Sequence, residues 1–348
     1  MSEPLIPFVK LPEIPLSFLA HIPLVGDWID AADPPSIKPF GTLVALGVYL
    51  GTTQAMRRAR ERGYDLRLMS DYVFWTVATG FVISHVLDAI FYHPAAVVRN
   101  PLYLLKIWDG LSSYGGFIGA VVGSLAWKFY RREKVLGYID ITVSGMPLAW
   151  VFGRMGCSVV HDHPGLLSNH WLAVRFPPRS MMSSVEWLYW GPPYIGRFDL
   201  GFLEMVLTIP LAVAVAWLWR RKIQRPDGYY IAVVCMAYPP VRFLLDFLRV
   251  GPESAITGAD PRYGGLTPAQ WASILLFATA VLVFRHMRNK ERALAAAAAG
   301  GAGSASGEQA SGEESPPSED EEPSEQASGE DSPPPEDEEP GASTGRTR

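Results

Sequence analysis

The chain has 348 residues and a formal net charge of −5, but residues 300–348 hold 14 acidic and 2 basic residues, whereas residues 1–299 hold 21 acidic and 28 basic ones. A basic, strongly apolar body with an acidic tail argues against a water-soluble enzyme and against a tail that binds nucleic acid. The only cysteines are Cys157 and Cys235, which excludes a disulfide framework and a cysteine-based structural zinc site.

The first 38 residues lack the basic start of a signal peptide and are interrupted by prolines, so we expect a surface segment or an interfacial helix outside the membrane. Apolar stretches then recur through residues 39–292, each near the ~20 residues needed to cross a bilayer's hydrocarbon core. Two are shorter than ideal, yet seven in a row predict an all-α polytopic membrane protein with seven transmembrane helices. The stretches are Pro39–Met56, Tyr72–Tyr92, Ser112–Tyr130, Leu136–Phe152, Leu200–Trp219, Gly228–Val250 and Thr267–Phe284.

Basic residues give an independent test of this topology, because cytoplasmic loops are enriched in lysine and arginine. Alternate short connections hold 16 basic residues, and the other connections hold nine over far more chain. This alternation predicts an N-terminus outside and a C-terminus in the cytoplasm. The basic-rich segments are 57–70, 131–135, 220–227 and 285–292, and the other set is 1–38, 93–111, 153–199 and 251–266.

The last segment, 293–348, is predicted to be a disordered acidic tail in the cytoplasm. From Gly300 it is rich in Ala, Gly, Ser, Glu and Pro, and one acidic unit occurs twice, at 308–323 and 325–340. It has no aromatic or branched aliphatic residue after Gly300, so it cannot bury enough apolar surface to offset the entropy of ordering. A binding role for the tail is the less favoured alternative.

Three clusters at the outer ends of the spans are functional candidates, because ionisable groups at membrane depth are costly. The first is 108–119, Trp-Asp-Gly-Leu-Ser-Ser-Tyr-Gly-Gly-Phe-Ile-Gly, which enters the third span. Its glycines, Gly115 and Gly116 among them, permit close approach of a ligand or of a neighbouring helix. From composition alone, helix packing is the favoured interpretation.

The second cluster is 153–157, Gly-Arg-Met-Gly-Cys, followed by His-Asp-His at 161–163. Arg154 between two glycines suits a phosphate, because a guanidinium offers forked donors. An arginine that reaches the lipid headgroups is the alternative. The His-Asp-His alternation occurs in metal sites, but no third ligand motif is visible, so we expect no metal site and no cofactor.

The third cluster is the strongest and lies in the outer half of the sixth span. Its members are spaced by four, four and three residues, which places them on one face of a helix. Two arginines and a carboxylate facing lipid would be costly, so this face must meet the bundle interior or a polar cavity. A structural ion-pair ladder is the alternative to a site for an anionic phospholipid headgroup, which all three clusters could share. The residues are Tyr238, Arg242, Asp246 and Arg249.

Taken together, these blocks resemble the prolipoprotein diacylglyceryl transferase family. The resemblance implies a monomeric bacterial inner-membrane enzyme with its active site facing the periplasm. It would move a diacylglyceryl group from phosphatidylglycerol to the lipobox cysteine thiol of preprolipoproteins and release glycerol phosphate. Its partners would be the lipid, preprolipoprotein signal peptides and the membrane, with no nucleic acid. The matching segments are Asn100–Gly119, Gly153–Gly156, Tyr238–Arg249 and Gly265–Gln270, whose order fits across 38–288.

The resemblance also implies residue roles. Arg154 and Arg242 would hold the headgroup and stabilise the leaving phosphate, with Arg249 as a third arginine. Asp246 stands where the family usually has glutamate and would orient an arginine. The other candidates for substrate binding are Tyr238, Gly115, Gly116, His85, and two acidic residues that match or lie near family glutamates, Asp162 and Glu204.

The chain departs from the family pattern at two positions that bear on catalysis. Tyr114 stands where the family usually has histidine, and Cys157 where it usually has asparagine. A phenol with a reference pKa near ~10 is a poor base at neutral pH, so the base that deprotonates the thiol stays open among His85, Asp246 and Tyr114.

Two other functions stay open at this point. One is a diverged relative that binds or transfers anionic headgroups with a different acceptor, for which Cys157 could be the nucleophile, although a buried structural thiol is favoured. The other is a non-catalytic membrane protein that binds lipid or acts as a carrier. The spans show neither an internal repeat nor the paired broken helices typical of transporters.

Overall fold

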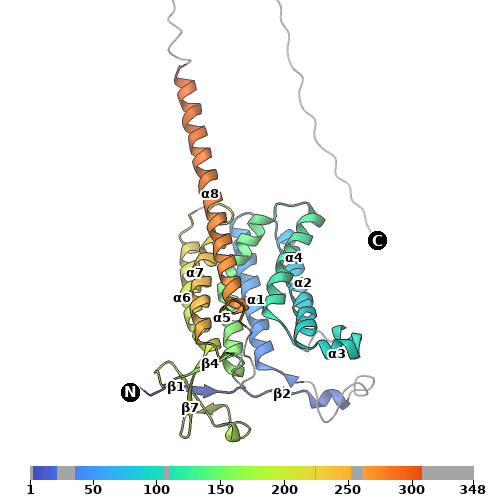
Figure 1. The fold of residues 1–348 in the computed structure, drawn as a ribbon. Helices are drawn as coiled ribbons and strands as arrows, with labels where there is room; N and C mark the ends of the chain where they lie inside the picture. Colours follow the sequence, from blue (N-terminus) through green and yellow to red (C-terminus); the bar gives the residue numbers. More distant parts are fainter. Residues whose placement is uncertain (1–2, 22–35, 106–109, 224, 252–261, 308–348) are drawn as a thin grey trace, which may run out of the picture. The chain divides into compact units, whose positions relative to one another are not determined.

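The computed structural model describes residues 3–21, 36–105, 110–223, 225–251 and 262–307, and the chain divides into two units, Met1–Leu294 and Ala295–Arg348. The first unit is a bundle of long helices with a small sheet at one end (Figure 1). In the described residues, seven long helices coincide with the seven apolar stretches. They are α1 (Pro39–Glu61), α2 (Leu66–Tyr92), α4 (Ser113–Arg131), α5 (Val135–Val160), α6 (Leu200–Arg220), α7 (Tyr229–Leu245) and α8 (Pro268–Gly307).

Five of these helices, α2, α5, α6, α7 and α8, are both long enough and apolar enough to cross a membrane. The prediction of a helical membrane protein is therefore confirmed. Helices α1 and α4 have the length but not the hydropathy, because glycines, threonines and a glutamine interrupt α1 and glycines and serines interrupt α4. The count of seven spans stays a prediction.

The glycines of these two helices lie where neighbouring backbones come close, α1 along α5 and α4 along α2. A Cβ atom at Gly47 of α1 would lie 2.7 Å from the carbonyl oxygen of Ala149, and one at Gly119 of α4 would lie 2.6 Å from that of Thr79. Small residues allow membrane helices to approach this closely. The residues that lower the hydropathy of α1 and α4 therefore serve helix packing.

Gly119→Ala is expected to lower the thermal stability of the protein in detergent. The added Cβ would also meet the Cα atom of Gly80 at 2.8 Å, and only movement of the backbone relieves such contacts. Overpacking of this kind costs about 1–3 kcal/mol. Gly116→Ala is the matched control on the same helix, because a Cβ there has no atom within 4 Å. Equal melting temperatures for the two variants would contradict the prediction.

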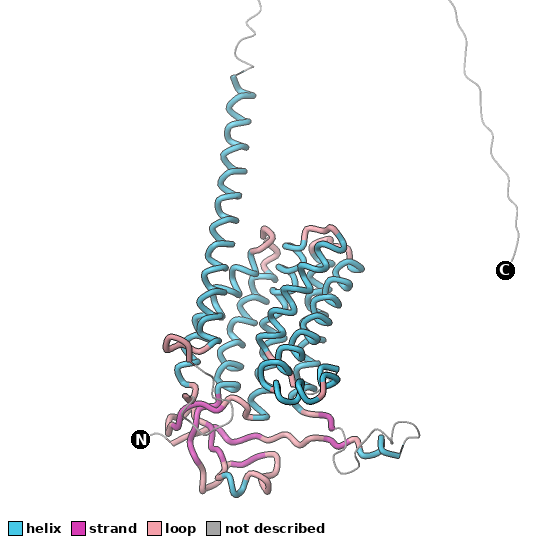
Figure 2. The backbone as a smooth tube through the Cα atoms, turned by 45° about the vertical axis from the view of Figure 1, so that its right-hand side comes forward, coloured by secondary structure: helices cyan, strands magenta, loops and turns pink. Residues whose placement is uncertain are grey.

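The prediction of an all-α protein is wrong in one respect, because the N-terminal segment and the connection before α6 form a five-stranded sheet (Figure 2). The strand order is β4-β7-β5-β1-β6, with β1 parallel to β5 and antiparallel to β6. Strands of two to five residues are too short for a reliable alternating pattern. They are β1 (Ile6–Val9), β4 (Pro164–Leu167), β5 (Val174–Phe176), β6 (Leu188–Tyr189) and β7 (Ile195–Asp199); a separate pair is β2 (Ile14–Pro15) and β3 (Ser36–Ile37).

His161 joins this sheet to the helices. It ends α5 with a φ of 53°, its Nδ1 lies 2.5 Å from Oδ2 of Asp199, and its Nε2 lies 2.9 Å from the carbonyl oxygen of Val9. The other oxygen of Asp199 accepts from the backbone N–H of Phe202 and so caps α6. The imidazole also stacks on Phe8 of β1. His161 is thus a structural link, and it fixes the residues that follow it.

Three boundaries differ from the sequence-based expectations. Helix α5 continues to Val160, so the connection between α5 and α6 begins at His161 and not at residue 153. Helix α7 ends at Leu245, and a short 3-10 turn, Asp246–Leu248, places Arg249 in extended backbone beyond the helix. Helix α8 runs to Gly307, into the segment assigned to the tail, because a run of alanines has the highest helix propensity. The predicted disorder of 308–348 lies outside the described residues. The remaining short helices are η1 (Ser17–His21), α3 (Pro94–Arg99), η3 (Pro101–Leu105) and η4 (Arg179–Met181).

A buried aspartate joins four helices at the end of the bundle away from the sheet. Oδ1 of Asp140, in the first turns of α5, accepts from the backbone N–H groups of Tyr230 and Ile231 at 2.7 and 3.0 Å, and so caps α7. Its Oδ2 pairs with Nη1 of Arg62, which follows α1, at 3.2 Å. The guanidinium of Arg62 also lies 4.7 Å above the ring of Trp219 in α6.

Candidate functional site

A cavity of about 770 Å³ is lined by residues of α2, α4, α5, α7 and α8 and by the segments that flank the sheet. It brings together side chains from all three sequence clusters, the first and third of which are more than a hundred residues apart in the chain. Cavities with a few convergent polar groups in an apolar wall are the usual form of a ligand site. The ionisable residues that line it are Asp88, Tyr114, Arg154, His163, Tyr238, Arg242 and Arg249.

Two of the arginines share one buried carboxylate. Glu204, in the second turn of α6, is 1 % exposed. Its Oε1 lies 2.9 Å from Nε of Arg154 on α5, and its Oε2 lies 3.0 Å from Nη1 of Arg242 on α7. Three helices thus meet in one ionic network, and Glu204 sets the positions of both guanidinium groups.

Two aromatic residues complete this network. The hydroxyl of Tyr238, one turn before Arg242 on α7, donates to Oε1 of Glu204, and Nε1 of Trp150 donates to the same oxygen at 3.0 Å. Trp150 is one turn before Arg154 on α5, and its ring lies 4.8 Å from the guanidinium carbon of that arginine. Spacings of four residues place such pairs on one helix face. Glu204 is therefore fully engaged, and the arginine pair is rigidly held.

The third arginine is held by Asp246, which is buried completely. Oδ1 of Asp246 lies 3.2 Å from Nη2 of Arg242 and 3.1 Å from Nε of Arg249, and Oδ2 accepts from the hydroxyl of Thr267. Thr267 and Gln270 also bond reciprocally through side chain and backbone in a capping box that begins α8. The 265–270 segment thus anchors the carboxylate that orients two arginines.

The remainder of the cavity wall is mostly apolar and comes mainly from α4 and α8. The three guanidinium groups gather around Glu204 and Asp246, and aliphatic and aromatic side chains of the two helices line the same cavity. This combination suits a ligand with an anionic group and a hydrocarbon portion. The apolar lining residues of these helices include Phe117, Ile118, Val121 and Val122 of α4 and Ala272, Leu275 and Leu276 of α8.

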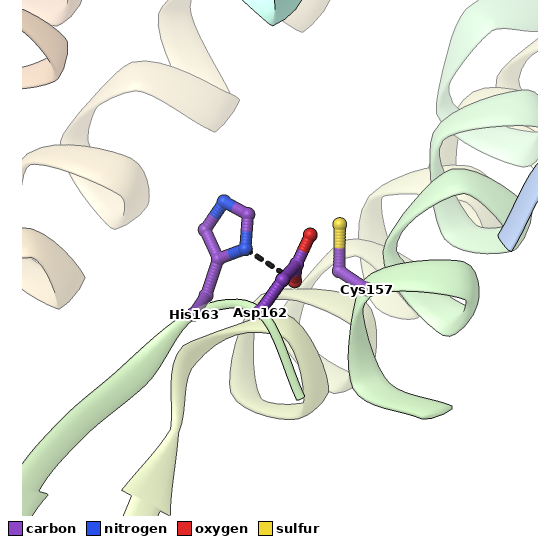
Figure 3. Close-up of side chains that lie close together, drawn as sticks. All are labelled: Cys157, Asp162 and His163. Atoms are coloured by element: carbon purple, nitrogen blue, oxygen red, sulfur yellow. Dashed lines mark hydrogen bonds and ion pairs between the residues drawn. The ribbon is translucent and has the colours of Figure 1, made fainter. Parts of the chain in front are cut away.

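His163 also lines the cavity, and Asp162 beside it points toward Cys157 (Figure 3). Nδ1 of His163 lies 2.5 Å from Oδ1 of Asp162. Potential ligand atoms of Cys157, Asp162 and His163 lie within 4.8 Å of one another, so by distance alone they could hold a metal ion. Nη1 of Arg154, however, lies 3.7 Å from the Sγ atom of Cys157. A fixed positive charge at that place opposes a cation.

A family model described as "Prolipoprotein diacylglyceryl transferase" matches residues 29–285, a range that includes every residue lining the cavity. The chain belongs to this family. A phosphatidylglycerol–prolipoprotein diacylglyceryl transferase 2 of Clostridium perfringens is 23% identical over 256 residues, which are 74% of this chain and 93% of that relative. The corresponding transferase of Staphylococcus xylosus is 25% identical over 264 residues, covering 75% and 88%. That of Thermus thermophilus is 35% identical over 127 residues, covering 35% and 44%.

In this diacylglyceryl transferase family member, not every residue that the resemblance singles out reaches the cavity. His85 of α2 is completely buried, and its ring nitrogens lie 3.3 and 3.4 Å from the carbonyl oxygens of Gly110 and Tyr103. Its contacts fasten the segment before α4. Gly115 packs on α2, where a Cβ would lie 2.6 Å from the Cα atom of Ser84, whereas Gly116 has open space beside it. Neither His85 nor the two glycines line the cavity among the described residues, whereas the neighbouring Tyr114 does.

Cys157 is buried and lies where α5 approaches α6, since a Cβ at Gly201 would be 2.9 Å from that of Cys157. This position fits the interpretation of a structural thiol. The sequence analysis gave no site role to Trp150 or Thr267, and it considered His163 only as a metal ligand. A signal for the first was its spacing of four residues from Arg154. For His163 the signal was the His-Asp-His sequence, in which His161 bonds to the sheet and His163 lines the cavity.

Proposed function

We propose that this protein transfers the diacylglyceryl group of phosphatidylglycerol to the lipobox cysteine thiol of preprolipoproteins. Membership of the family and the names of the relatives support this reaction. The observation that carries the proposal is the cavity itself, in which three oriented arginines adjoin an apolar wall. An anionic headgroup would lie against the guanidinium groups of Arg154, Arg242 and Arg249, and the acyl chains would follow α4 and α8.

The reaction that this arrangement serves is a displacement at carbon. The thiolate sulfur attacks the glyceryl CH₂ carbon that carries the phosphate, a C–S bond forms, and the C–O bond to the phosphate breaks. The bonding electrons leave with the phosphate oxygen, and glycerol phosphate is released. Guanidinium groups aimed at the phosphate stabilise the charge that develops on it. Glu204 and Asp246 would then act through the arginines, because their oxygens are occupied by Arg154, Arg242 and Arg249.

We also propose the finer topology: seven spans, a periplasmic N-terminus, a cytoplasmic C-terminus and a cavity that faces the periplasm of the bacterial inner membrane. The alternation of basic residues supports it, since 16 basic residues lie in the connections assigned to the cytoplasm. The enzyme would act as a monomer on lipid and signal peptide, without nucleic acid. The activity of a reporter fused to the C-terminus, measured in each compartment, tests the orientation.

Complementation tests the proposed reaction. The wild-type chain is expected to restore lipoprotein modification in cells depleted of their own transferase, and Arg242→Ala is expected to lower modification by about 10²-fold or more. Arg179→Ala is the matched arginine control, because that side chain is exposed on the outer connection. Cys157→Ser should retain activity, which separates this reaction from one in which Cys157 is the acceptor. A wild-type chain that inserts into the membrane but fails to restore modification would overturn the proposal.

A further inference from the structure

Transfer to a thiol requires a group that accepts the thiol proton, because the thiolate is the nucleophile and a free cysteine has a reference pKa near ~8.5. The cavity offers few candidates. The carboxylate of Asp88 lines it, but an aspartate with a reference pKa near ~3.9 is a weak base for a thiol. Arginine cannot accept a proton, and the hydroxyl of Tyr238 donates to Glu204. Asp246 is enclosed by two arginines and Thr267. Tyr114 is a phenol, and with a reference pKa near ~10 such a group is protonated at neutral pH and cannot readily accept the thiol proton.

His163 differs from these groups in both contacts and exposure. It lies at the cavity wall directly before β4, and its side chain is 23% exposed. Nδ1 lies 2.5 Å from the carboxylate of Asp162. A carboxylate partner fixes the tautomer with the proton on Nδ1 and leaves Nε2 as the acceptor. Within the described part of the chain, Nε2 of His163 has no hydrogen-bond partner.

The neighbouring histidine shows that this arrangement is specific to position 163. His161 also pairs with an aspartate, Asp199, but its Nε2 is occupied by the carbonyl oxygen of Val9 and its ring is stacked on Phe8. His161 is therefore held in the structural link, whereas His163 lines the cavity.

We propose that His163 is the catalytic base for the substrate thiol and that Asp162 is its positioning residue. Nε2 of His163 takes the S–H proton as the sulfur attacks the glyceryl carbon. The C–O bond breaks, its electrons pass to the phosphate, and the imidazolium then returns the proton to the released phosphate or to water. This inference rests on the proposed function, and it assigns the role left open by Tyr114 to a residue outside the matching sequence blocks.

The charged groups around His163 agree with this assignment. Arg154, Arg242 and Arg249 line the same cavity and would bind the phosphate that the thiolate must displace. Arg154 reaches toward Cys157, on the far side of Asp162, which disfavours a metal ion held by the three residues. Asp88, Tyr114 and Tyr238 are the other titratable groups that line this cavity in the described residues.

The test uses the full-length protein in detergent with phosphatidylglycerol and a synthetic lipobox peptide. His163→Gln is expected to lower kcat by about 10²-fold or more, which is the usual contribution of a general base. The KM for phosphatidylglycerol should stay near the wild-type value, because the arginines are unchanged. The rate of His163→Gln should rise with pH as the peptide thiol ionises, near its reference pKa of ~8.5, whereas the wild-type rate should level off at lower pH.

Control variants distinguish the loss of a base from a structural effect of the substitution. His170→Gln, at an exposed histidine on the same connection, should match the wild type in rate and pH profile. Asp162→Asn should show a smaller loss with an altered pH profile, and Asp162→Glu should recover part of it. If His163→Gln melts at a lower temperature than the wild type, His163→Asn is measured instead. If the substituted His163 variant, Gln or Asn, keeps the wild-type rate, or loses rate with an unchanged pH profile, the inference is overturned. A wild-type protein that transfers no lipid would instead refute the proposed function.

Discussion

Glu204→Ala should inactivate the protein and also destabilise it. The substitution leaves the buried guanidinium groups of Arg154 and Arg242 without their shared partner and removes the acceptor of Trp150 and Tyr238. Removal of one partner from a buried ion pair costs about 3–5 kcal/mol, because an uncompensated charge stays behind. Without Glu204 the two arginines would no longer be held in position for a phosphate.

Two measurements check this expectation: transfer activity with phosphatidylglycerol and the melting temperature in detergent. Glu186→Ala is the control, because Glu186 is exposed on the connection between α5 and α6. Glu204→Gln should be intermediate in stability, since an amide keeps one acceptor oxygen but also brings an N–H₂ group toward a guanidinium. An active, stable Glu204→Ala variant would mean that the network does not hold the arginines as described.

The convergence of the arginines was predictable because two simple constraints act on them. Charged residues near span ends must avoid lipid, and the spacing from Tyr238 to Asp246 places them on one helix face. The resemblance added Glu204, whose role as a counter-charge is visible only in three dimensions, since it joins residues 50 and 38 positions away in the chain. The prediction that Arg249 lies on the same helix was wrong, because it follows α7 in extended backbone and bonds to Asp246 from there.

The sheet and His163 were less predictable for a physical reason. The strands are short, and β1 pairs with segments more than 160 residues away, so no local pattern marks the sheet. His163 lines the cavity because His161 is tied to Asp199 and Val9, which are contacts between distant segments. The two histidines were visible in the sequence, but the sheet determines which of them is held by Val9 and Asp199 and which lines the cavity. The cost of a charge next to lipid can be read from the local sequence, whereas the orientation of a side chain in a loop is set by tertiary contacts.

Asp140→Ala, at the opposite end of the same helices, should lower the stability of the protein without lowering the transfer rate of its folded molecules. Asp140 is completely buried and supplies the acceptors for two backbone N–H groups at the start of α7 and for Arg62. Leaving buried donors and a guanidinium without their acceptor should destabilise the protein by on the order of 3 kcal/mol. Arg154 is fourteen residues further along α5, about 21 Å at the helical rise. The folded fraction should therefore retain its transfer rate per molecule.

Asp227→Ala is the matched control, because Asp227 lies 3.8 Å from the same Arg62 but is 48% exposed. Exposed ion pairs contribute about 0–1 kcal/mol, so this variant should melt close to the wild type. Melting temperatures and transfer rates corrected for folded protein distinguish the cases. Equal destabilisation by the two substitutions would show that burial of Asp140 is not what matters. A loss of rate in folded Asp140→Ala would show that this end of the bundle is coupled to the arginines through α5 or α7.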